Sequence, residues 1–505
     1  MEPACLRHTE LPHTSRLFSD FLYQYHRVER FYTAPPSTGY PEDRRPALIE
    51  ALRLQNTNES ALERLAHPGA VAVVTGQQVG LFGGPAYTIY KALTAARLAA
   101  DLTAHGRPAV PVFWLATEDH DWPEVNHCHV YGGAHRPSRL DVSGTPGTAQ
   151  PVGGVVPEGW PVDELRQLLQ ELPFGADVAA IVADAYAPGR SMGDAFRSLL
   201  ESLLKPWGFL FLDPLQPAIR RLAAPMMREA VAIGPDLNQL LLARNRELEN
   251  AGYHTQVHVD ARTSLFFLFE KGRRVPLREV RYSSEELAAR AQDLSPNALL
   301  RPVLQDFMLP TAAYIGGPAE LAYFAQSQVL YERLLGHMPR VVSRNGFTLI
   351  DARSAKLLER YGLRLQDFFH GEHPLRERVA ARLVPEGLDA QFDAATATVR
   401  TTLDGLRKSL ASFDPTLESA MKKGQLKMMH QLTRMQEKTA RAAMARDERA
   451  GADASYLYST LYPQKHLQER YYSILPFLAQ HGPDLLDRLY ETVHMDCPDH
   501  VLMPL

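Results

Sequence analysis

Residues 71–127 read VAVVTGQQVGLFGGPAYTIYKALTAARLAADLTAHGRPAVPVFWLATEDHDWPEVNH and predict one strand, loop, helix, strand unit. The apolar, β-branched run at 71–74 and the run at 110–115 each predict a strand buried on both faces of a parallel sheet. Between them, apolar residues at helical spacing predict a helix from about residue 85 to residue 102. The stretch therefore predicts an open α/β fold.

Polar loops follow the carboxyl ends of both predicted strands. The first loop begins with Gln77 and Gln78 and continues through glycines, among them Gly83 and Gly84, which permit positive φ or close approach of a ligand. The second loop carries a dense group of polar side chains: Glu118, Asp119, His120, Asp121, Glu124, Asn126 and His127. Because ligands of open α/β sheets bind at the carboxyl ends of the strands, we expect both loops to open onto one site.

A second stretch, residues 311–323, repeats this arrangement. A strand at 311–315 meets Gly316-Gly317-Pro318, and a helix begins near Glu320 with Tyr323 one turn in. Its GGPAELAY resembles GGPAYTIY at 83–90, where Tyr87 and Lys91 lie in the first turns of the helix. Helix N-termini carry free N–H groups and partial positive charge, so both starts predict contacts to phosphate or carboxylate.

The motifs leave several kinds of chemistry open. The glycine loop matches neither GxxxxGK[ST] nor GxGxxG, and a tight turn without a ligand is the plainer alternative. The acidic and histidine cluster favours acid–base or substrate contacts over metal binding or simple helix capping. No GxSxG, HExxH or Cys-His signature occurs, which disfavours covalent hydrolysis.

Composition narrows the class of protein. The chain has 505 residues, 45% of them hydrophobic, and a net charge of 54 − 58 = −4. These values predict a soluble protein of more than one domain with neither nucleic acid nor a membrane as its partner. Three cysteines without CxxC spacing favour a reducing, cytoplasmic setting.

Outside these units, the pattern predicts further elements. A helix is expected within 11–32, a buried strand within 206–214, and a long helix that breaks near Gly234-Pro235. Residues 253–282 alternate like β hairpins with a turn at Lys271-Gly272. Residues 386–412 and 415–450 predict an antiparallel helical hairpin that pairs with itself or with another subunit. In its second helix an imperfect coiled-coil seam runs through Leu417, Met421, Gly424, Met428, Gln431, Met435 and Thr439.

Several long strings resemble the BshC family of bacillithiol biosynthesis, which adds cysteine to an acceptor. They are LPHTSRLFSDFLY, VVTGQQVGLFGGPAYTIYKAL, PVFWLATEDHDWPEVNH, RPVLQDFMLPTAAYIGGPAELAYFAQ and YPQKHLQERYYSILPFL. The resemblance covers essentially the whole chain. It implies a Rossmann-like core akin to class I aminoacyl-tRNA synthetases, two connecting insertions and a coiled coil used for homodimerisation. It also implies ligation of L-cysteine to glucosaminyl malate.

With this resemblance, the chain divides into seven segments. They are the first part of the core (1–130), insertion 1 (131–205), the continued core (206–252), insertion 2 (253–295), the last part of the core (296–384), an antiparallel coiled coil (385–461) and a C-terminal segment packing back on the body (462–505).

Position in the predicted site suggests roles for individual residues. We expect Asp119, His120 or Asp121 to orient or deprotonate the attacking amine, ATP to activate the cysteine carboxyl, and no metal to be held. The expected substrate-binding residues are Gln77, Gln78, Gly83, Gly84, Tyr87, Lys91, Glu118, Asn126, His127, Arg301, Gly316, Gly317, Glu320, Tyr323 and Arg344. The alternatives are a non-catalytic protein that binds a nucleotide or thiol metabolite and dimerises through the coiled coil, and a tRNA-modifying or tRNA-charging enzyme.

Overall fold

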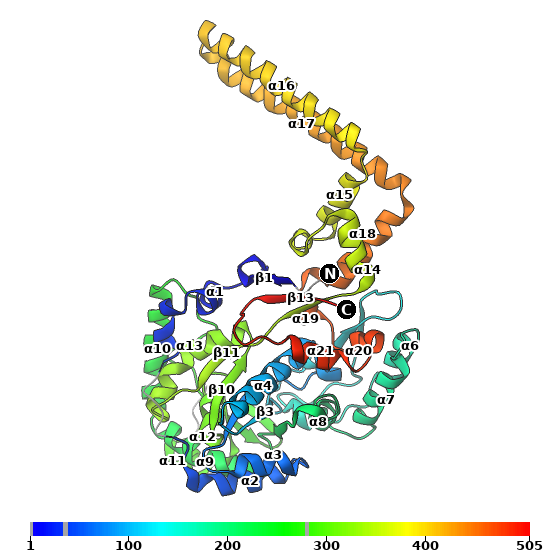
Figure 1. Cartoon of the computed structure of the whole chain (residues 1–505). Coiled ribbons are helices and arrows are strands. Elements are labelled where there is room, and N and C mark those ends of the chain that lie inside the picture. Colours follow the sequence, from blue (N-terminus) through cyan, green and yellow to red (C-terminus); the bar gives the residue numbers. More distant parts are fainter. Residues whose placement is uncertain (1–3, 34–38, 278–281) are drawn as a thin grey trace. The chain divides into compact units, whose positions relative to one another are not determined.

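The computed structural model describes residues 4–33, 39–277 and 282–505. The chain forms two compact units, one made of Pro3–Thr348 and Glu469–Met503, the other mainly of Leu349–Gln468. We call them the core unit and the helical unit; both are drawn in Figure 1. Within the described ranges, no helix combines the length and the apolar character needed to cross a bilayer.

The core unit is built on a five-stranded parallel sheet. Its order is β11 (Arg340–Ser343), β10 (Thr311–Gly316), β2 (Val71–Gln77), β3 (Ala109–Leu115) and β6 (Leu210–Leu212). The strands predicted at 71–74, 110–115 and 311–315 are confirmed, and each is longer than predicted. The strand predicted within 206–214 is confirmed as the short β6.

Two crossovers leave the middle of this sheet in opposite directions. Helix α4 (Tyr87–Ala104) connects β2 to β3, and α13 (Pro318–Leu334) connects β10 to β11. Because such crossovers are right-handed, the two helices lie on opposite faces of the sheet. The adjacent strands β2 and β10 therefore form a topological switch point, where a crevice opens at their carboxyl ends.

One large apolar core covers the α13 face of the sheet. Ala72 and Val74 of β2 and Leu210 of β6 pack there with Phe324 and Tyr331 of α13. The other helices of this layer are α2 (Arg45–Arg53), α3 (Glu59–Ala66), α9 (Pro217–Ala232), α10 (Gly234–Asn250) and α12 (Arg301–Met308). The long helix predicted in this region does break at Gly234, where α9 ends and α10 begins.

Two groups of elements lie outside the parallel sheet of the core unit, one between β3 and β6 and the other between α10 and α12. The first contains the antiparallel pair β4 (His127–Val130) and β5 (Ser138–Asp141), followed by α6 (Val162–Leu169), α7 (Gly175–Ala185) and α8 (Met192–Leu203). In the second, β7 (Phe266–Glu270) pairs with β8 (Arg273–Pro276) and with β9 (Leu294–Pro296). The turn predicted at Lys271-Gly272 is confirmed, and both residues have positive φ, 51° and 74°.

The first and last strands of the core unit pair with each other. β1 (Ala4–Leu6) runs antiparallel to β13 (His500–Pro504), with Cys5 opposite Val501. The N-terminal helix is shorter than predicted: α1 (Arg16–Tyr23) begins after Ser15, whose hydroxyl caps it by accepting from the Phe18 amide at 3.2 Å. The C-terminal segment supplies α19 (Gln468–Tyr471), α20 (Leu475–His481) and α21 (Leu485–Thr492).

The helical unit contains the predicted hairpin. Helices α16 (Glu386–Phe413) and α17 (Thr416–Arg446) lie side by side, and α14 (Ala352–Tyr361), α15 (Glu372–Arg382) and α18 (Glu448–Leu461) complete the unit (Figure 1). Gln425 and Gln436 of α17 donate to carboxylates of α16, so they mark the side facing that helix. Met428 and Met435 of the predicted seam do not lie at the centre of the contact between α16 and α17. Their side chains are 47% and 51% exposed.

Two buried histidines near the chain ends predict acid sensitivity of the core unit. Burial lowers the pKa of His8 to about 3 and that of His500 to about 4, and for His8 the neighbouring His500 adds to the effect. The folded state therefore binds fewer protons than the unfolded chain below the ordinary histidine pKa of 6.5. Stability is full above pH 6.5 and falls as the pH drops towards 4, by roughly 2 to 3 kcal/mol for each of the two histidines.

This expectation is checked by urea unfolding between pH 4.5 and 7.5. His500→Gln should flatten the pH dependence of the unfolding free energy, because it removes one of the two titrating groups. His67→Gln, at an exposed position, should leave the slope as it is. A wild-type stability that does not change over this range would contradict the expectation.

Candidate active site

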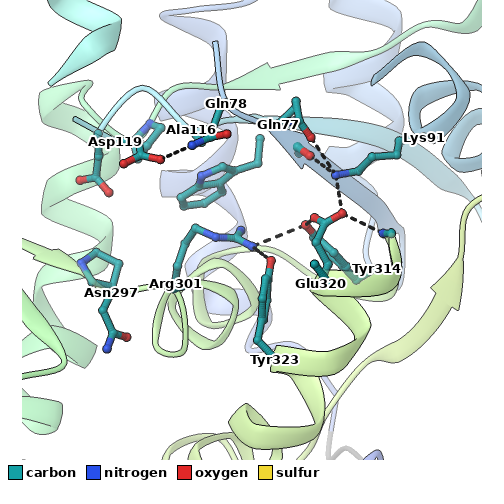
Figure 2. A pocket seen from close by; sticks show the side chains of 18 of the residues that line it. Gln77, Gln78, Lys91, Ala116, Asp119, Asn297, Arg301, Tyr314, Glu320 and Tyr323 are labelled. Atoms are coloured by element: carbon teal, nitrogen blue, oxygen red, sulfur yellow. Dashed lines mark hydrogen bonds and ion pairs between the residues drawn. The ribbon is translucent and has the colours of Figure 1, made fainter. Parts of the chain in front are cut away.

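A cavity of about 490 Å³ lies at the switch point of the sheet. Its walls come from the ends of β2 and β10, the loop after β3, and the first turns of α4, α12 and α13. Figure 2 shows how the labelled side chains face this space. The predicted residues that line it are Gln77, Gln78, Tyr87, Lys91, Glu118, Asp119, His120, Arg301, Gly317, Glu320, Tyr323 and Arg344. The start of the first loop, the loop after β3 and the second glycine turn thus meet at one cavity, as predicted, but Gly83 and Gly84 of the first loop do not line it.

Six of the residues expected at the site lie outside the cavity lining. Gly83 and Gly84 belong to a turn packed inside the protein, where the Gly83 amide donates to the Tyr186 hydroxyl at 3.4 Å. Gly316 ends β10, and its carbonyl accepts from the Arg344 amide at 2.9 Å. Asp121 is exposed and precedes the short helix α5 (Trp122–Val125). Asn126 follows this helix, and His127 is the first residue of β4, which pairs with β5. The expected placement of these six is therefore corrected.

Both helix starts that predicted anion contacts already have partners. The Ala86 amide, at the start of α4, donates to the Tyr472 carbonyl at 2.7 Å. The Gly317 amide, at the start of α13, donates to Oε2 of Glu320 at 2.8 Å, in a capping arrangement. These two amides are consequently not available to an anion in the cavity.

Lys91 is a buried structural cation. Its Nζ donates to the Gly76 carbonyl, to Oε1 of Gln77 at 3.3 Å and to Oε2 of Glu320 at 2.6 Å. Burial lowers the pKa of Lys91, and Glu320 opposes that effect. Burial alone would raise the pKa of Glu320, but Lys91 and the Tyr314 hydroxyl hold it below its ordinary value. With all three of its N–H groups engaged, Lys91 ties α4 to α13 and has none left for an anion.

Arg301 is a cation of the cavity without a carboxylate partner among the described residues. Its Nη2 donates to the Tyr323 hydroxyl at 2.7 Å and to the Tyr314 hydroxyl at 3.5 Å, and its Nη1 donates to Gln305 at 3.3 Å. Figure 2 shows the guanidinium held between Tyr323 and the Tyr314–Glu320 pair. A partly buried guanidinium oriented only by neutral groups is suited to binding a phosphate or a carboxylate.

Arg470 adds a second such cation from the C-terminal segment. It lies in α19, is exposed, lines the cavity and forms no ion pair within the described ranges. Arg344, by contrast, is held in a buried pair with Glu469, with Nη1 at 2.9 Å from Oε2. Of the five lysine and arginine side chains that line the cavity, Arg301 and Arg470 are thus the ones without a carboxylate partner in the part of the chain that the structure describes.

Asp119 and His120 are neighbouring titratable residues that line the cavity. Oδ2 of Asp119 accepts from Nε2 of Gln78 at 2.6 Å, and Oδ1 accepts from the His120 amide at 2.8 Å. Nδ1 of His120 lies 3.3 Å from Nη1 of Arg274. A guanidinium can only donate, so Nδ1 accepts and the neutral ring carries its proton on Nε2. A carboxylate such as that of Asp119 can accept a proton, and the Nε2–H of His120 can donate a hydrogen bond.

Arg274, which sequence reasoning missed, organises this side of the cavity. It is buried, lies over the Phe267 ring at 3.9 Å and donates to the Ser295 hydroxyl at 3.0 Å and to the Pro296 carbonyl at 2.7 Å. Its Nη1 is 3.8 Å from Oδ1 of Asp119. Burial lowers the pKa of Arg274, while Glu118 and Asp119 oppose the effect. The β7–β8 pair thereby contributes a charge to the site.

Glu118 also lines the cavity on the side of Arg274. It is buried and pairs with Nη1 of Arg220 on α9 at 2.8 Å. Burial raises the pKa of Glu118, although Arg220 and Arg274 lower it in part. Other lining residues absent from the sequence predictions include Trp114, Phe267, Asn297, Tyr314 and Arg470. Because side chains alternate along a strand, one of Arg273 and Arg274 was expected to point inward. The sequence does not show which of the two does so.

No group of three or more histidine, cysteine, aspartate or glutamate side chains within the described residues is arranged to hold a metal ion.

The fold and the cavity define a Rossmann-like α/β protein with a small-molecule site at the switch point of its sheet. Comparison with known proteins narrows this class. Residues 1–345 match the family model of the bacillithiol biosynthesis BshC N-terminal Rossmann-like domain, and residues 347–504 match that of its C-terminal coiled-coil domain. The chain therefore belongs to the BshC family of bacillithiol biosynthesis.

Relatives that match over nearly the full length support this assignment. A protein of Solibacter usitatus named "Putative cysteine ligase BshC" is 52% identical, and the match covers 100% of both chains. Proteins with the same name from Koribacter versatilis and Salinibacter ruber are 39% and 32% identical, covering 99% and 96% of this chain and 99% and 95% of theirs.

Proposed function

We propose that this protein is a ligase that joins the carboxyl of L-cysteine to the amine of glucosaminyl malate, with ATP activating the carboxyl. Family membership supports the ligase class and the pathway. The observation that carries the assignment to this cavity is the presence, in one space, of a carboxylate able to accept a proton and of two cations without carboxylate partners in the described chain. A volume of about 490 Å³ is in the range typical of small-molecule sites.

The cations serve the anionic parts of the substrates. Glucosaminyl malate carries carboxylates and ATP carries phosphates, and both kinds of anion suit a guanidinium. Arg301 is fixed by Tyr323 and Tyr314, so it binds an anion with little further loss of side-chain freedom. Arg470, being exposed, can approach the same anion from the C-terminal segment.

Asp119 and His120 serve the bond-forming step. The acceptor's ammonium group must lose a proton before its nitrogen attacks the activated carboxyl carbon. Asp119 takes that proton. A C–N bond then forms and the C–O bond to the activating group breaks, and the Nε2–H of His120 is available to stabilise the developing negative charge.

The test is mass spectrometry of the purified protein with cysteine, ATP and glucosaminyl malate. The expected product has the mass of the acceptor plus cysteine minus one water, and the reaction should depend on ATP. The nucleotide released, AMP or ADP, identifies how the carboxyl is activated. Absence of the product under conditions where both substrates bind would overturn the proposal and favour a non-catalytic binding protein.

We further propose that the helical unit makes the protein a homodimer. One flank of α17 presents Leu417, Met428 and Met435, which are 36%, 47% and 51% exposed. They recur at heptad-related spacing with Met421, and such an apolar flank on a two-helix hairpin is suited to packing against further helices.

Charge substitutions on this flank test the dimer. Met428→Glu combined with Met435→Glu should convert a particle of twice the chain mass into one of the chain mass, as measured by light scattering after gel filtration. Burying two carboxylates in an apolar interface costs several kcal/mol, which is enough to dissociate it. Lys427→Glu with Arg434→Glu introduces the same residues at the same spacing on exposed neighbouring positions and should leave the mass unchanged. Equal masses for both double variants would contradict dimerisation through this flank.

A further inference from the structure

Helix α17 carries a strong positive charge, although the net charge of the whole chain is −4. Within Thr416–Arg446 there are seven lysine and arginine residues and two glutamates, which gives this helix a net charge of +5. The neighbouring helix α16 has three basic and four acidic residues. The positive charge of the hairpin is therefore concentrated on one of its two helices.

Five basic residues of α17 lie in one line, which we call the basic row. Its members are Lys423, Lys427, His430, Arg434 and Lys438, and the steps between them are four, three, four and four residues. Because an α-helix has about 3.6 residues per turn, these steps keep all five on one face of the helix, over a length of about 22 Å. All five residues are exposed.

The basic row faces away from α16. Gln436, which donates to Asp389 of α16 at 2.8 Å, lies two positions after Arg434, and two positions correspond to about 200° around the helix. Met435 of the proposed dimer flank lies one position after Arg434, about 100° around the helix. Neither the contact with α16 nor packing through that flank therefore covers the basic row.

The charges of the basic row are not neutralised by carboxylates of the protein. Within the described residues no member of the row forms an ion pair, whereas Arg407 of α16 pairs with Asp404 at 3.6 Å. One carboxylate, that of Glu437, lies beside the row. Like charges one helical turn apart repel each other, so a partner with repeated negative charges would stabilise this face of the helix.

The spacing of the row indicates what kind of polyanion would bind. The basic residues recur once per helical turn, about 5.4 Å apart, and nucleic acid presents one phosphate per nucleotide along each strand. Lysine and arginine donate charge-assisted hydrogen bonds to phosphate oxygens. Helix α17 contains no Phe, Tyr or Trp on which an unpaired base could stack. The row is therefore suited to a duplex, in which the bases are paired and the phosphates face outward.

An anionic membrane is the other polyanion that attracts basic helices. A helix that binds a membrane surface inserts large apolar residues such as Trp, Phe or Leu beside its cations. The basic row contains no apolar residue along its length, and α17 contains no aromatic residue. The pattern therefore favours nucleic acid over a membrane.

From these observations we infer that the basic row of α17 binds the phosphate backbone of double-stranded nucleic acid without regard to sequence. The inference is independent of the proposed ligase reaction, because no residue of the row lines the cavity at the sheet. Four lysine and arginine side chains that neutralise phosphates release counterions. The logarithm of the association constant should consequently fall with the logarithm of the salt concentration, with a slope of about −3 to −4.

Fluorescence anisotropy of a labelled DNA duplex of about 20 base pairs, titrated with the full-length protein between 50 and 200 mM salt, measures this slope. Lys427→Gln combined with Arg434→Gln removes two charges from the middle of the row. This variant should reduce the magnitude of the slope by about 2 and weaken binding in 0.1 M salt roughly 30- to 100-fold. Lys427→Arg combined with Arg434→Lys conserves the charges and should bind as the wild type does. Failure of the wild type to bind the duplex at the lowest salt concentration would overturn the inference.

Helix α16 offers a matched control. Arg400→Gln combined with Arg407→Gln removes the same charge at the same spacing of seven residues from the other helix of the hairpin. This variant should keep the salt slope of the wild type and bind within about threefold of it. Equal losses for the two neutralised variants would show that the duplex responds to the total charge of the hairpin, and would overturn the basic row as the site.

Vesicles of phosphatidylserine and phosphatidylcholine test the membrane alternative. At about 0.15 M salt the wild-type protein should not sediment with them, because surface charges are largely screened and the row has no apolar residue to insert. Sedimentation with vesicles that is lost in the Lys427→Gln, Arg434→Gln variant and is stronger than binding to the duplex would overturn the inference in favour of a membrane.

Discussion

Asp119→Asn is expected to slow ligation by roughly 10²- to 10⁴-fold, the range found when a general base is removed. Asparagine has nearly the same shape, and its side-chain oxygen can still accept from the His120 amide, which lies 2.8 Å from Oδ1 in the wild type. It has almost no basicity, however, so the ammonium group of the acceptor would keep its proton. The effect should fall on kcat, with the KM for cysteine changed little, because the lost interaction belongs to the proton transfer.

The chain offers a matched control at Glu124. Both Asp119 and Glu124 accept from Nε2 of Gln78, at 2.6 Å and 2.7 Å, but only Asp119 lines the cavity. Glu124→Gln therefore changes the other carboxylate that accepts from Gln78 but leaves the lining of the cavity unchanged. This variant should retain activity within about threefold of the wild type. Steady-state rates of product formation, measured by mass spectrometry, compare the two. Equal losses for both variants would mean that Asp119 acts by holding Gln78 in place.

The sheet and its binding crevice were predictable from the sequence because the signals are local. Buried parallel strands are continuous apolar runs, as at 71–74 and 311–315, and each is followed by glycines that permit a close turn. Gly76, which lies within β2, allows close approach of another kind: a Cβ there would lie 2.8 Å from the Trp114 carbonyl oxygen of the neighbouring strand. Once two such units are recognised, the rule for open sheets places their loops at one edge.

The partners of individual charges could not be predicted, because they come from distant parts of the chain. Lys91 is engaged by Glu320, 229 residues away, and the start of α4 is covered by the Tyr472 carbonyl. The spacing of Gly317 and Glu320 is typical of a capping arrangement, in which Glu320 accepts from the Gly317 amide. The same sequence is also compatible with a helix start that binds an anion, so the sequence does not decide between the two. Only tertiary structure decides which cations have carboxylate partners. Of the expected anion contacts, Lys91 and Arg344 have such partners and Arg301 has none, and Arg470 is added to it.

A second large effect is expected at Glu469, on stability rather than on rate. Glu469 and Arg344 form a buried pair with side chains 2% and 6% exposed, and Oε2 of Glu469 also accepts from the Phe347 amide at 3.1 Å. Removing one charge from a buried pair leaves the other without compensation, at a cost of about 3 to 5 kcal/mol. Glu469→Gln should lower the free energy of unfolding of the core unit by that amount at pH 7, as measured by urea denaturation.

The pH dependence of this loss follows from the pKa of the carboxyl. Burial alone would raise the pKa of Glu469, but Arg344, by charge and hydrogen bonds, and His500, by charge, bring it down to about 2. A depressed carboxyl pKa adds stability above the ordinary value of 4.5, and this stability is lost as the pH falls through the folded-state value. The difference between wild type and Glu469→Gln should therefore be largest near neutral pH and shrink below pH 4.5.

An exposed pair in the same unit provides the comparison. Arg139 and Asp141 are 2.7 Å apart with side chains 52% and 51% exposed, so Asp141→Asn should cost no more than about 1 kcal/mol. Suppose that Glu469→Gln lowers the free energy of unfolding as little as Asp141→Asn does, but strongly raises the KM for the acceptor. Arg344 would then bind substrate directly, and its pairing with Glu469 would not be what holds it in place. Loss of stability with little change in KM would instead show that the pair fixes Arg344 as a wall of the cavity, leaving the anion to Arg301 and Arg470.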